Sequence, residues 1–334
     1  MKAVCMGVLI MDMFPDQYGV SLTQVRSWLP MPGGAPANVA VALAKFGTQT
    51  AFLGQVGEDA FGHMLADCLA GWGVRVHGIR FDAQRRTTMN FHAKPNPTET
   101  EYLFYRNPGA DTGYHITEAD IAVLKQADVL HFDSMSMTDT PMRDSAIAAM
   151  VAAREANVWV SFDYNYREPV WPNANASIEA MRAVLPYCDS LKVNAEEAAM
   201  LCPGVASSVM PDMLLAQGPR VVLITRGEEG SSIAAGSQSA TIQPMSVQTV
   251  DAIGCGDAYA AGFLYALFER FTKEQLAATR FTGSDWVRLV ECARFASVVS
   301  GLTAQKKGAL QALPTADEVD AAWSTISEQD PQWT

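Results

Sequence analysis

Short apolar segments alternate with helical segments from residue 117 to residue 225. Strands are predicted at 129–132, 158–162, 190–193 and 220–225, and helices at 117–126, 141–157, 177–185, 196–201 and 212–217. Parallel strands need a crossover connection, usually a helix that then covers one face of the sheet. The alternation therefore predicts an α/β fold with a mainly parallel central sheet between two layers of helices.

The segments outside this region extend the sheet and add a second one. A first strand is predicted at 3–11, where apolar residues alternate, and a strand at 50–56 lies between helices at 39–46 and 59–72. The segments 74–81, 86–94 and 99–106 have polar faces and are expected to form a small separate sheet. The remaining expectations are a hairpin at 231–247, helices at 256–269, 283–304 and 315–327, and a loose tail after Gln329.

The composition excludes several classes of protein. The 334 residues carry a formal net charge of −12, whereas a nucleic-acid-binding protein needs clustered Lys and Arg. The six cysteines form no Cys-x-x-Cys pair, which favours reduced thiols in a cytoplasmic protein, and no His-Glu-x-x-His motif indicates a zinc hydrolase. No apolar window is long enough to span a bilayer. We therefore expect neither a nucleic acid nor a membrane as partner.

Polar side chains collect at the ends of the predicted strands. Ligands of open parallel sheets bind at the carboxyl ends of the strands. The sequence therefore predicts a pocket at this edge of the sheet. The residues at or just after the strand ends are Asp12, Asp133, Asp163, Asn165, Arg167, Asn194 and Thr225.

The segment 251–257 (DAIGCGD) indicates which ligand and which reaction this pocket serves. It precedes the apolar run 258–268, which predicts a buried helix, so that Gly254 and Gly256 lie on the first turn of that helix. Backbone N–H groups without an intrahelical partner and the positive end of the helix dipole form an anion site there. A carboxylate repels a bound phosphate, so its place beside one requires an explanation. Asp257 is explained if it removes a proton from a hydroxyl that attacks the phosphate.

Two other motifs each have a structural alternative. Gly33 and Gly34 let a ligand approach bare backbone and Asn38 offers a donor and an acceptor to a polyol, but a tight turn at a helix start explains them equally well. Arg167 suits a phosphate or a substrate oxygen. The alternative for this arginine is a surface side chain paired with Glu168.

Two motifs at later strand ends are also open to two interpretations. Asn194 and Glu197 fit a capping box at a helix start, and they also fit a place near hydrated magnesium, because Mg²⁺ prefers a few oxygen ligands and retained waters. The segment 225–230 (TRGEEG) fits a nucleotide-binding turn or a simple loop. The Gly-x4-Gly-Lys-Ser/Thr motif is missing, and the glycine pair of 251–257 is followed by Tyr259 where a dinucleotide-binding fingerprint has a third glycine, which argues against a dehydrogenase.

Residues 33–47 (GGAPANVAVALAKFG) and 251–263 (DAIGCGDAYAAGF) together resemble the two signature regions of the ribokinase-like (PfkB-type) carbohydrate kinases. The order and separation of the two motifs agree with that family, and the resemblance runs from about residue 3 to about residue 314. Within the family the chain is most similar to the fructokinases, in the segments 35–38, 105–106, 109–111, 162–167 and 194–197.

The resemblance implies a fold and an activity. It implies a single kinase domain over residues 1–334, with a three-layer α/β/α core and a small β-sheet lid contributed by about 12–32 and 86–112. The implied reaction transfers the γ-phosphoryl group of ATP to a primary hydroxyl of a sugar, with fructose 6-phosphate as the expected product from fructose. Mg²⁺ and K⁺ are the expected ions, and the lid is expected by analogy to pair two chains in a homodimer.

The resemblance also assigns roles to residues of this chain. Asp257 is the expected general base, and the amides of Gly254, Cys255 and Gly256 are the expected anion hole. Arg167 is expected to contact the sugar or the transferred phosphoryl group. The residues expected to hold the sugar are Asp12, Gly33, Gly34, Asn38, Arg106 and Asp257. The residues expected at the nucleotide are Asn194, Glu197, Thr225, Gly227, Gly230, Gly256 and Ser297, with Glu197 ordering Mg²⁺ through water. A monovalent cation is expected at Asp251 and the carbonyl groups of Ile253, Thr303, Lys306 and Gly308.

The chain departs from the family pattern at two positions. Ala252 and Cys255 stand where the family usually has Thr and Ala. Both residues are small, so activity is expected to survive, and Cys255 is expected to add sensitivity to thiol reagents.

Two alternative functions accompany these expectations. The nearest is a kinase of the same family that acts on 2-keto-3-deoxygluconate, with Tyr102, Tyr105 and Arg106 meeting the acid group of the sugar. The second is a sugar sensor that kept the fold without catalysis. The retention of Asp257 and of both glycines before it speaks against a sensor.

Overall fold

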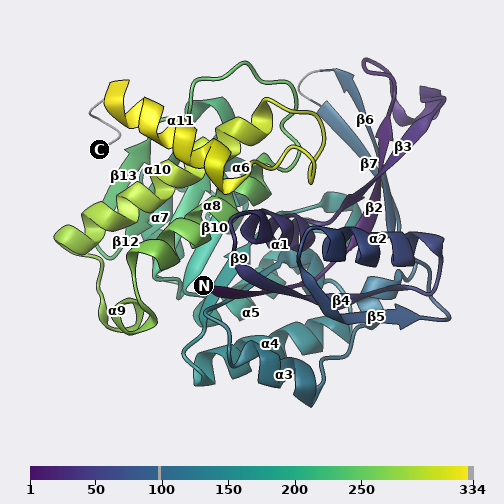
Figure 1. Cartoon of the computed structure of the whole chain (residues 1–334), viewed down its shortest axis with the longest axis horizontal. Helices are drawn as coiled ribbons and strands as arrows, with labels where there is room; N and C mark the ends of the chain where they lie inside the picture. Colours follow the sequence, from purple (N-terminus) through teal and green to yellow (C-terminus); the bar gives the residue numbers. More distant parts are fainter. Residues whose placement is uncertain (97–98, 330–334) are drawn as a thin grey trace.

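The main sheet has nine strands among the residues that the computed structural model describes, 1–96 and 99–329. Their order is β13-β12-β11-β10-β9-β8-β1-β4-β5 (Figure 1). The strands from β11 to β5 run parallel to their neighbours, and β12 and β13 add an antiparallel hairpin at one edge. The predicted α/β class with a mainly parallel sheet is therefore confirmed. The bounds are β1 (Lys2–Met6), β4 (Gln49–Gly57), β5 (Arg75–Asp82), β8 (Val129–Asp133), β9 (Trp159–Asp163), β10 (Ser190–Asn194), β11 (Val221–Thr225), β12 (Ser231–Ala235) and β13 (Gln238–Ile242).

Helices cover both faces of this sheet and complete three layers (Figure 1). The hydrophobic core of one face joins the sheet to α1 (Ala35–Lys45), α2 (Ala60–Gly71), α8 (Cys255–Arg270), α9 (Lys273–Ala278), α10 (Ser284–Ala304) and α11 (Ala316–Gln329). The core of the other face joins it to α3 (Glu118–Leu124), α4 (Met142–Glu155), α5 (Ala174–Val184), α6 (Ala195–Leu201) and α7 (Met210–Leu215). In the described chain, no helix has both the length and the apolar character that a membrane crossing requires.

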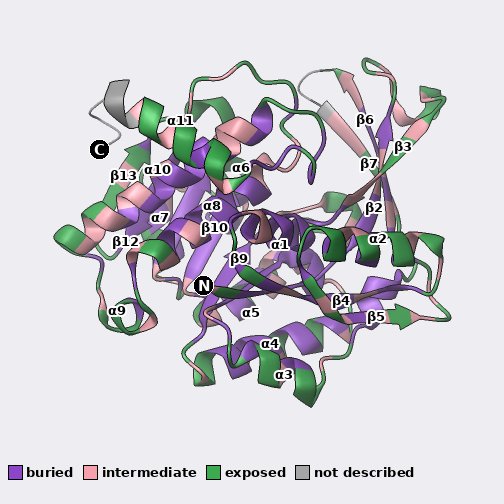
Figure 2. Ribbon diagram, viewed as in Figure 1, coloured by how far each residue is buried: buried purple, intermediate pink, exposed green. Residues whose placement is uncertain are grey.

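The two cores follow from the period of two along each strand. In β11, Val221 and Leu223 enter one core, whereas Val222 and Ile224 enter the other. Successive side chains of a strand point to opposite faces, so a sheet covered on both faces needs near-continuous apolar strands. Figure 2 shows the resulting pattern, with the central strands buried and the exposed residues on the outer surfaces of the helices and in the loops.

A second, smaller sheet has the strand order β3-β2-β6-β7. Its bounds are β2 (Ile10–Pro15), β3 (Trp28–Gly33), β6 (Met89–Asn96) and β7 (Glu99–Tyr105). The strands β2 and β6 pair in parallel, and the two outer pairs are antiparallel. Figure 1 shows this small sheet projecting from one end of the main sheet. Short 3₁₀ turns lie at Leu22–Gln24, Ala110–Gly113, Ser134–Met137, Glu168–Val170, Leu185–Tyr187 and Gly227–Glu229.

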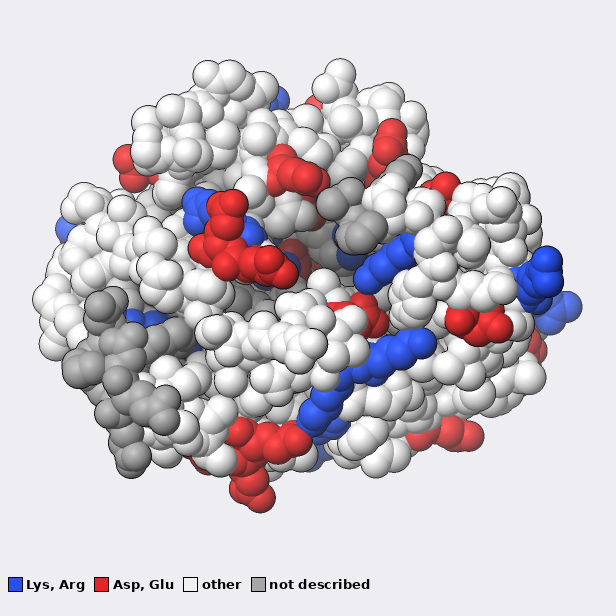
Figure 3. All heavy atoms as spheres, turned by 90° about the horizontal axis from the view of Figure 1, so that it is seen from above, with Lys and Arg blue, Asp and Glu red and all other residues white. Residues whose placement is uncertain are grey.

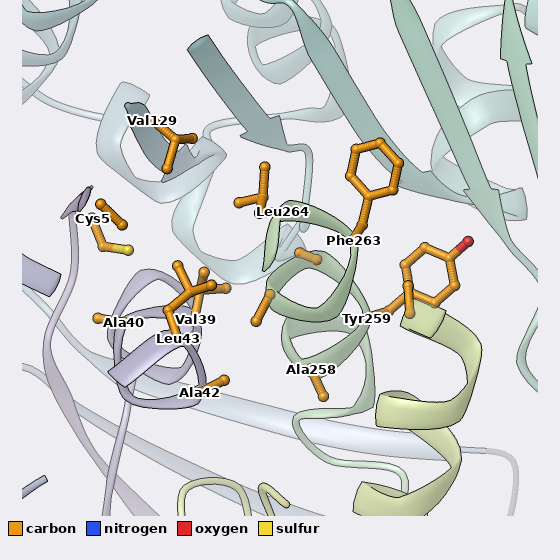
Figure 4. Close-up of a cluster of buried hydrophobic side chains, with 14 of the residues drawn as sticks. Cys5, Val39, Ala40, Ala42, Leu43, Val129, Ala258, Tyr259, Phe263 and Leu264 are labelled. Atoms are coloured by element: carbon orange, nitrogen blue, oxygen red, sulfur yellow. The ribbon is translucent and has the colours of Figure 1, made fainter. Parts of the chain in front are cut away.

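The helix α8 is buried between α1 and α10. Figure 4 shows Val39 and Leu43 of α1 lying against α8, which carries Phe263 and Leu264. On the side of α10, a Cβ at Gly262 would come within 2.8 Å of Cγ2 of Val299, so a glycine lets the two helices approach closely. This packing on both sides holds the N-terminus of α8 in place.

The structure corrects three details of the predicted elements. The run 3–11 is divided into β1 of the main sheet and β2 of the small sheet, because Gly7 adopts φ 145° and ends the first strand. The segment 74–81 is β5, an edge strand of the main sheet, and only the other two polar strands belong to the small sheet. A period of two predicts a strand but not the strand with which it pairs. The helix α9 was not predicted. The tail after Gln329 lies outside the described residues.

Candidate active site

Two cavities meet at the N-terminus of α8. The first, which we call the polar cavity, has a volume of about 270 Å³ and lies between the small sheet and the carboxyl ends of the main strands. The second, the larger cavity, has about 680 Å³, a volume typical of small-molecule sites. Ala252 and Gly256 line both cavities, and Asp257 lines the polar one. A ligand in each cavity would therefore meet the other beside Asp257.

The first turn of α8 has unpaired backbone amides. Gly254 is the N-cap residue with a left-handed φ of 79°, a conformation that favours glycine. In the described chain, the N–H groups of Gly254, Gly256 and Asp257 make no backbone hydrogen bond, whereas that of Cys255 donates to the carbonyl of Ala252 at 3.3 Å. The predicted set of Gly254, Cys255 and Gly256 is therefore corrected at one position, since Cys255 is engaged and Asp257 replaces it. These amides and the helix dipole favour an anion.

Asp257 is buried and oriented by one amide. Its side chain accepts a hydrogen bond of 2.7 Å from Nδ2 of Asn38 in α1. Burial raises the pKa of Asp257 to about 6, and the charge of Asp163 adds to this rise, whereas the Asn38 hydrogen bond opposes it. The carboxylate is therefore mostly ionised at pH 7 and more basic than an exposed aspartate.

Lys192 is a site residue that the sequence analysis did not select. Its Nζ lies 2.7 Å from Oδ2 of Asp163, and the lysine also lines the polar cavity. A Cβ at Gly256 would come within 2.9 Å of this Nζ, which places the ammonium group against the first turn of α8. Burial alone would lower the pKa of Lys192, but the carboxylates of Asp163 and Glu197 raise it overall. The signal in the sequence was a lysine between two apolar residues of a predicted strand, Leu191 and Val193.

The small sheet supplies polar atoms to the polar cavity. Nδ2 of Asn90 donates to Oδ1 of Asp12 at 2.8 Å, and burial raises the pKa of Asp12 to about 6. The Oδ1 atoms of Asn38 and Asn90 are buried and have no hydrogen-bond partner among the described residues. Buried acceptors without donors are rare in folded proteins, so these two atoms point to a ligand with hydroxyl groups. Asn90 was not predicted.

The two glycines before α1 make room for this arrangement. A Cβ at Gly33 would overlap the carboxylate of Asp12. Gly34 has φ 105°, and a Cβ there would overlap the carbonyl oxygen of Val8. Gly34 lines the polar cavity, whereas Gly33 stands behind Asp12. Both positions therefore require glycine for steric reasons.

The two predicted arginines are placed differently. Arg167 lines the polar cavity, and its guanidinium lies 5.8 Å from the ring centre of Tyr102. Arg106 is buried away from the cavity lining, where Nε donates to Asp111 at 2.7 Å and Nη2 donates to the carbonyl of Met135 at 3.1 Å. Its donors join the small sheet to the main body. The structure therefore does not bring Arg106 to the predicted sugar site.

The larger cavity contains the residues predicted at the nucleotide, apart from one pair. Its wall includes the apolar side chains of Pro244, Met245 and Val247, which suit a flat ring. The predicted residues that line it are Thr225, Gly227, Gly230, Gly256 and Ser297.

Cys255 also lines the larger cavity. Burial raises the pKa of its thiol to about 12. Because the thiolate is the reactive form, the expected sensitivity to thiol reagents is not favoured at neutral pH.

Asn194 and Glu197 line neither cavity. The side chain of Asn194 accepts from the amide of Glu197 at 2.8 Å, and Oε2 of Glu197 accepts from the amide of Asn194 at 2.8 Å. The capping-box alternative is therefore confirmed. Oε1 of Glu197 also accepts from the amide of Tyr166. The described residues contain no cluster of three His, Cys, Asp or Glu side chains for a metal ion. Because both oxygens of Glu197 are engaged by backbone amides, this arrangement fits an Mg²⁺ held mainly by phosphate oxygens and water.

The carboxylate predicted to bind a monovalent cation already pairs with a lysine of the protein. Nζ of Lys94 lies 3.2 Å from Oδ1 of Asp251, which supplies the only carboxylate of the predicted donor set. The amides of Ile253 and Gly308 donate to the same carboxylate at 3.2 and 3.3 Å. As arranged, the residues do not fit a monovalent ion at Asp251.

A third cavity lies at the opposite edge of the main sheet. It has a volume of about 560 Å³ and is lined by residues at the amino ends of β8 to β11. Two of its cations are held by the protein itself, since Arg220 donates to the carbonyls of Leu276 and Thr279 and Lys273 donates to that of Ala127. None of the predicted site residues lines it.

The charged surface gives no competing site on the face shown in Figure 3. Acidic and basic side chains are interspersed there, and neither sign forms a continuous surface. A phosphate backbone is bound by clustered cations, which this face does not present.

The chain is similar to known carbohydrate kinases over most of its length. The family model described as "pfkB family carbohydrate kinase" matches residues 1–316. A probable fructokinase-6, chloroplastic, from Arabidopsis thaliana is 36% identical over 96% of this chain and 81% of its own length. The crystal structure of a fructokinase with bound ATP from Xylella fastidiosa superposes with a TM-score of 0.86 and 29% identity, covering 98% of each chain.

A second solved structure adds a sugar. The fructokinase from Vibrio cholerae O395 in its fructose, ADP and calcium ion bound form gives a TM-score of 0.81 and 26% identity, covering 96% of this chain and 98% of its own. A double mutant of that protein, in a fructose, ADP and potassium ion bound form, gives a TM-score of 0.80 and 26% identity, covering 96% and 97%. The family match over nearly the whole chain, the relative at 36% identity and the cavities beside Asp257 lead to one conclusion: this chain belongs to the pfkB family of carbohydrate kinases.

Proposed function

We propose that the protein is an ATP-dependent fructokinase, which transfers the γ-phosphoryl group of ATP to the primary hydroxyl that gives fructose 6-phosphate. One observation carries this proposal: Asp257 stands where a polar cavity and a larger cavity meet at the unpaired amides of α8. The similar proteins described as fructokinases, one with ATP and one with fructose and ADP, support the choice of substrates.

The polar cavity suits a neutral sugar better than a sugar acid. Asp12, Asn38 and Asn90 offer acceptors to hydroxyl groups. Of the three side chains considered for the acid group of 2-keto-3-deoxygluconate, only Tyr102 lines the cavity, since Arg106 is held elsewhere and Tyr105 is 62% exposed. The lysines in the wall already pair with Asp163 and Asp251. Arg167 also lines the cavity, and we assign its charge to the transferring phosphoryl group, so these contacts favour fructose over the sugar acid.

The proposed mechanism places proton transfer and charge stabilisation on different groups. Asp257 accepts the proton of the attacking hydroxyl while the oxygen forms its bond to the γ-phosphorus and the bond to the ADP oxygen breaks. Asn38 holds the carboxylate for this task. The unpaired amides of α8 stabilise the charge on the transferring group, and the cations of Lys192 and Arg167 lie in the same cavity wall.

Mg²⁺ would supply further charge stabilisation when it is bound with ATP. The residues proposed to order its waters are Asn194 and Glu197. Both oxygens of Glu197 are engaged by backbone amides, so its contribution would pass through water. The adenine and ribose are proposed to lie in the larger cavity, against Thr225, Gly227, Gly230 and Ser297.

We also propose that residues 1–334 form one kinase domain whose small sheet, together with the flanking parts of 12–32 and 86–112, serves as a lid. The small sheet contributes Asp12, Asn90 and Tyr102 to the polar cavity, so a bound sugar would be covered by it. Such a cover excludes water that would otherwise hydrolyse ATP. A cytoplasmic location is proposed as well, and the six free cysteines support a reducing compartment.

The first test is a panel of sugars with ATP and Mg²⁺, followed by ADP release and identification of the product. Fructose is expected to show the highest kcat/KM, because the cavity offers neutral acceptors, and NMR should place the phosphate on the primary hydroxyl at carbon 6. Preference for 2-keto-3-deoxygluconate would contradict the substrate. Sugar binding without any phosphorylated product would instead support the sensor.

The role of Asp257 is tested by Asp257→Asn. The amide keeps the shape but cannot accept the proton, so kcat is expected to fall by roughly 10²–10⁴-fold while sugar and ATP still bind. Steady-state kinetics and calorimetric binding measure the two effects. Asp212→Asn is the matched control, since Asp212 is an exposed residue in the first turn of α7 and lines neither of the two cavities. Near-normal turnover of Asp257→Asn would remove the base assignment.

The raised pKa of Asp257 predicts the pH dependence. The base must be ionised, so kcat/KM is expected to be constant above pH 6 and to fall by about tenfold per unit below pH 6. Asn38→Ala removes a hydrogen bond that favours the carboxylate, which should move this acid limb to higher pH. Asn173→Ala, at the exposed N-cap of α5, should leave it in place. A limb that does not respond to Asn38→Ala would assign the titration to another carboxylate, such as Asp12.

A homodimer through the small sheet is the last part of the proposal. The outer face of this sheet carries a row of aromatic rings, with Phe91 5.0 Å from Trp28 and 5.3 Å from Tyr105, and Leu103 beside them is 46% exposed. Exposed apolar patches of this kind mark protein interfaces. We expect the wild type to sediment as a dimer and Leu103→Glu as a monomer, whereas Val287→Glu, at an exposed position of α10, should not change the mass. A monomeric wild type would contradict this arrangement.

A further inference from the structure

Lys94 connects the small sheet to the loop that precedes α8. It lies on β6, and its Nζ is 3.2 Å from Oδ1 of Asp251, 157 residues later in the chain. The carboxylate of Asp251 is buried, with 3% of its side chain exposed, whereas the lysine side chain is 25% exposed. The pair therefore joins a buried anion to a cation that arrives from another part of the fold.

Asp251 holds the loop through three contacts. Besides Lys94, its carboxylate accepts hydrogen bonds from the amides of Ile253 and Gly308. The first of these amides lies within the segment that leads into α8, and the second lies in the loop after α10. A buried carboxylate that keeps its charge needs a positive partner, and removing that partner leaves an uncompensated charge. A cation at Asp251 is therefore expected to stabilise the loop that leads into the anion site.

Lys94 and a monovalent ion are competitors for this position. Both would bring a positive charge to the same carboxylate, and two cations within a few ångströms repel each other. His92 on the same strand adds no charge, because burial and the neighbouring Lys94 lower its pKa to about 4. Among the described residues, Lys94 is the cation that pairs with Asp251.

We propose that Lys94 is a positioning residue that takes the place of a monovalent cation at Asp251, so that catalysis does not require K⁺. This inference rests on the proposed kinase activity. Lys94 acts through Asp251 and the loop, although it also lines the polar cavity. Because the small sheet carries Lys94, the same sheet that covers the sugar also supplies the charge that orders the phosphate-binding loop.

The first experiment compares turnover in KCl with turnover in choline chloride at equal ionic strength. The wild type is expected to be equally active in both salts. Lys94→Met removes the charge and keeps the length, so its kcat is expected to fall by at least about tenfold in choline chloride. KCl or methylammonium chloride should restore it, because either cation can occupy the vacated position. Lys94→Arg keeps the charge and should remain independent of K⁺.

A second readout does not depend on activity. KCl is expected to raise the melting temperature of Lys94→Met above its value in choline chloride, and to leave that of the wild type unchanged. Lys125→Met is the matched control, since it removes an exposed lysine that pairs with Glu155 at 3.3 Å. For this control, neither the kcat nor the melting temperature should differ between KCl and choline chloride. The melting arm remains informative even if the wild type phosphorylates no sugar, which separates this inference from the proposed function.

Three results would overturn the inference. The first is a wild type that KCl activates strongly over choline chloride. The second is a Lys94→Met variant as active in choline chloride as the wild type. The third is a Lys94→Met variant whose loss no monovalent cation relieves. If Lys94→Met folds only in KCl, the inference is supported. If it folds in neither salt, the activities of the wild type and of Lys94→Arg in the two salts still test the inference.

Discussion

The burial of α8 between α1 and α10 is the constraint on which the site depends. An anion site made of backbone amides works only if the helix end that carries them does not move, because its energy comes from orientation. Gly262 against Val299 and the apolar side chains toward α1 give α8 neighbours on both sides. The first turn can therefore remain unpaired at Gly256 and Asp257 while the rest of the helix supplies the stability.

The second requirement is that separate parts of the chain meet at this helix end. The carboxyl ends of β9 and β10 bring Asp163 and Lys192, while the small sheet brings Asp12 and Asn90. Parallel strands place their carboxyl ends at one edge, and the short passage from β1 to β2 carries the chain from that edge into the small sheet. Topology thus assembles charges that are far apart in sequence.

The sequence was sufficient for features that rest on local chemistry. The first turn of α8 and the glycine pair before α1 could be predicted, because unpaired amides and steric limits follow from a few adjacent residues. Lys192, Asn90 and Lys94 were missed, because each is an ordinary strand residue whose role depends on a partner from a distant segment. Arg106 was predicted at the sugar for the same reason, whereas its N–H groups donate hydrogen bonds to Asp111 and to the carbonyl of Met135.

The crowded carboxyl groups of the site have a consequence for the whole fold. Folding raises the pKa values of Asp12 and Asp257 to about 6 and that of Asp133 to about 7, from an ordinary value of 3.8. A group with a higher pKa when folded adds to stability below its unfolded pKa, and this contribution is lost as the pH rises through the folded one. The reaction needs Asp257 in its ionised form. The contribution of these three acids to stability is therefore reduced at the pH where Asp257 is ionised, which is a trade-off between stability and activity at one cluster of carboxyl groups.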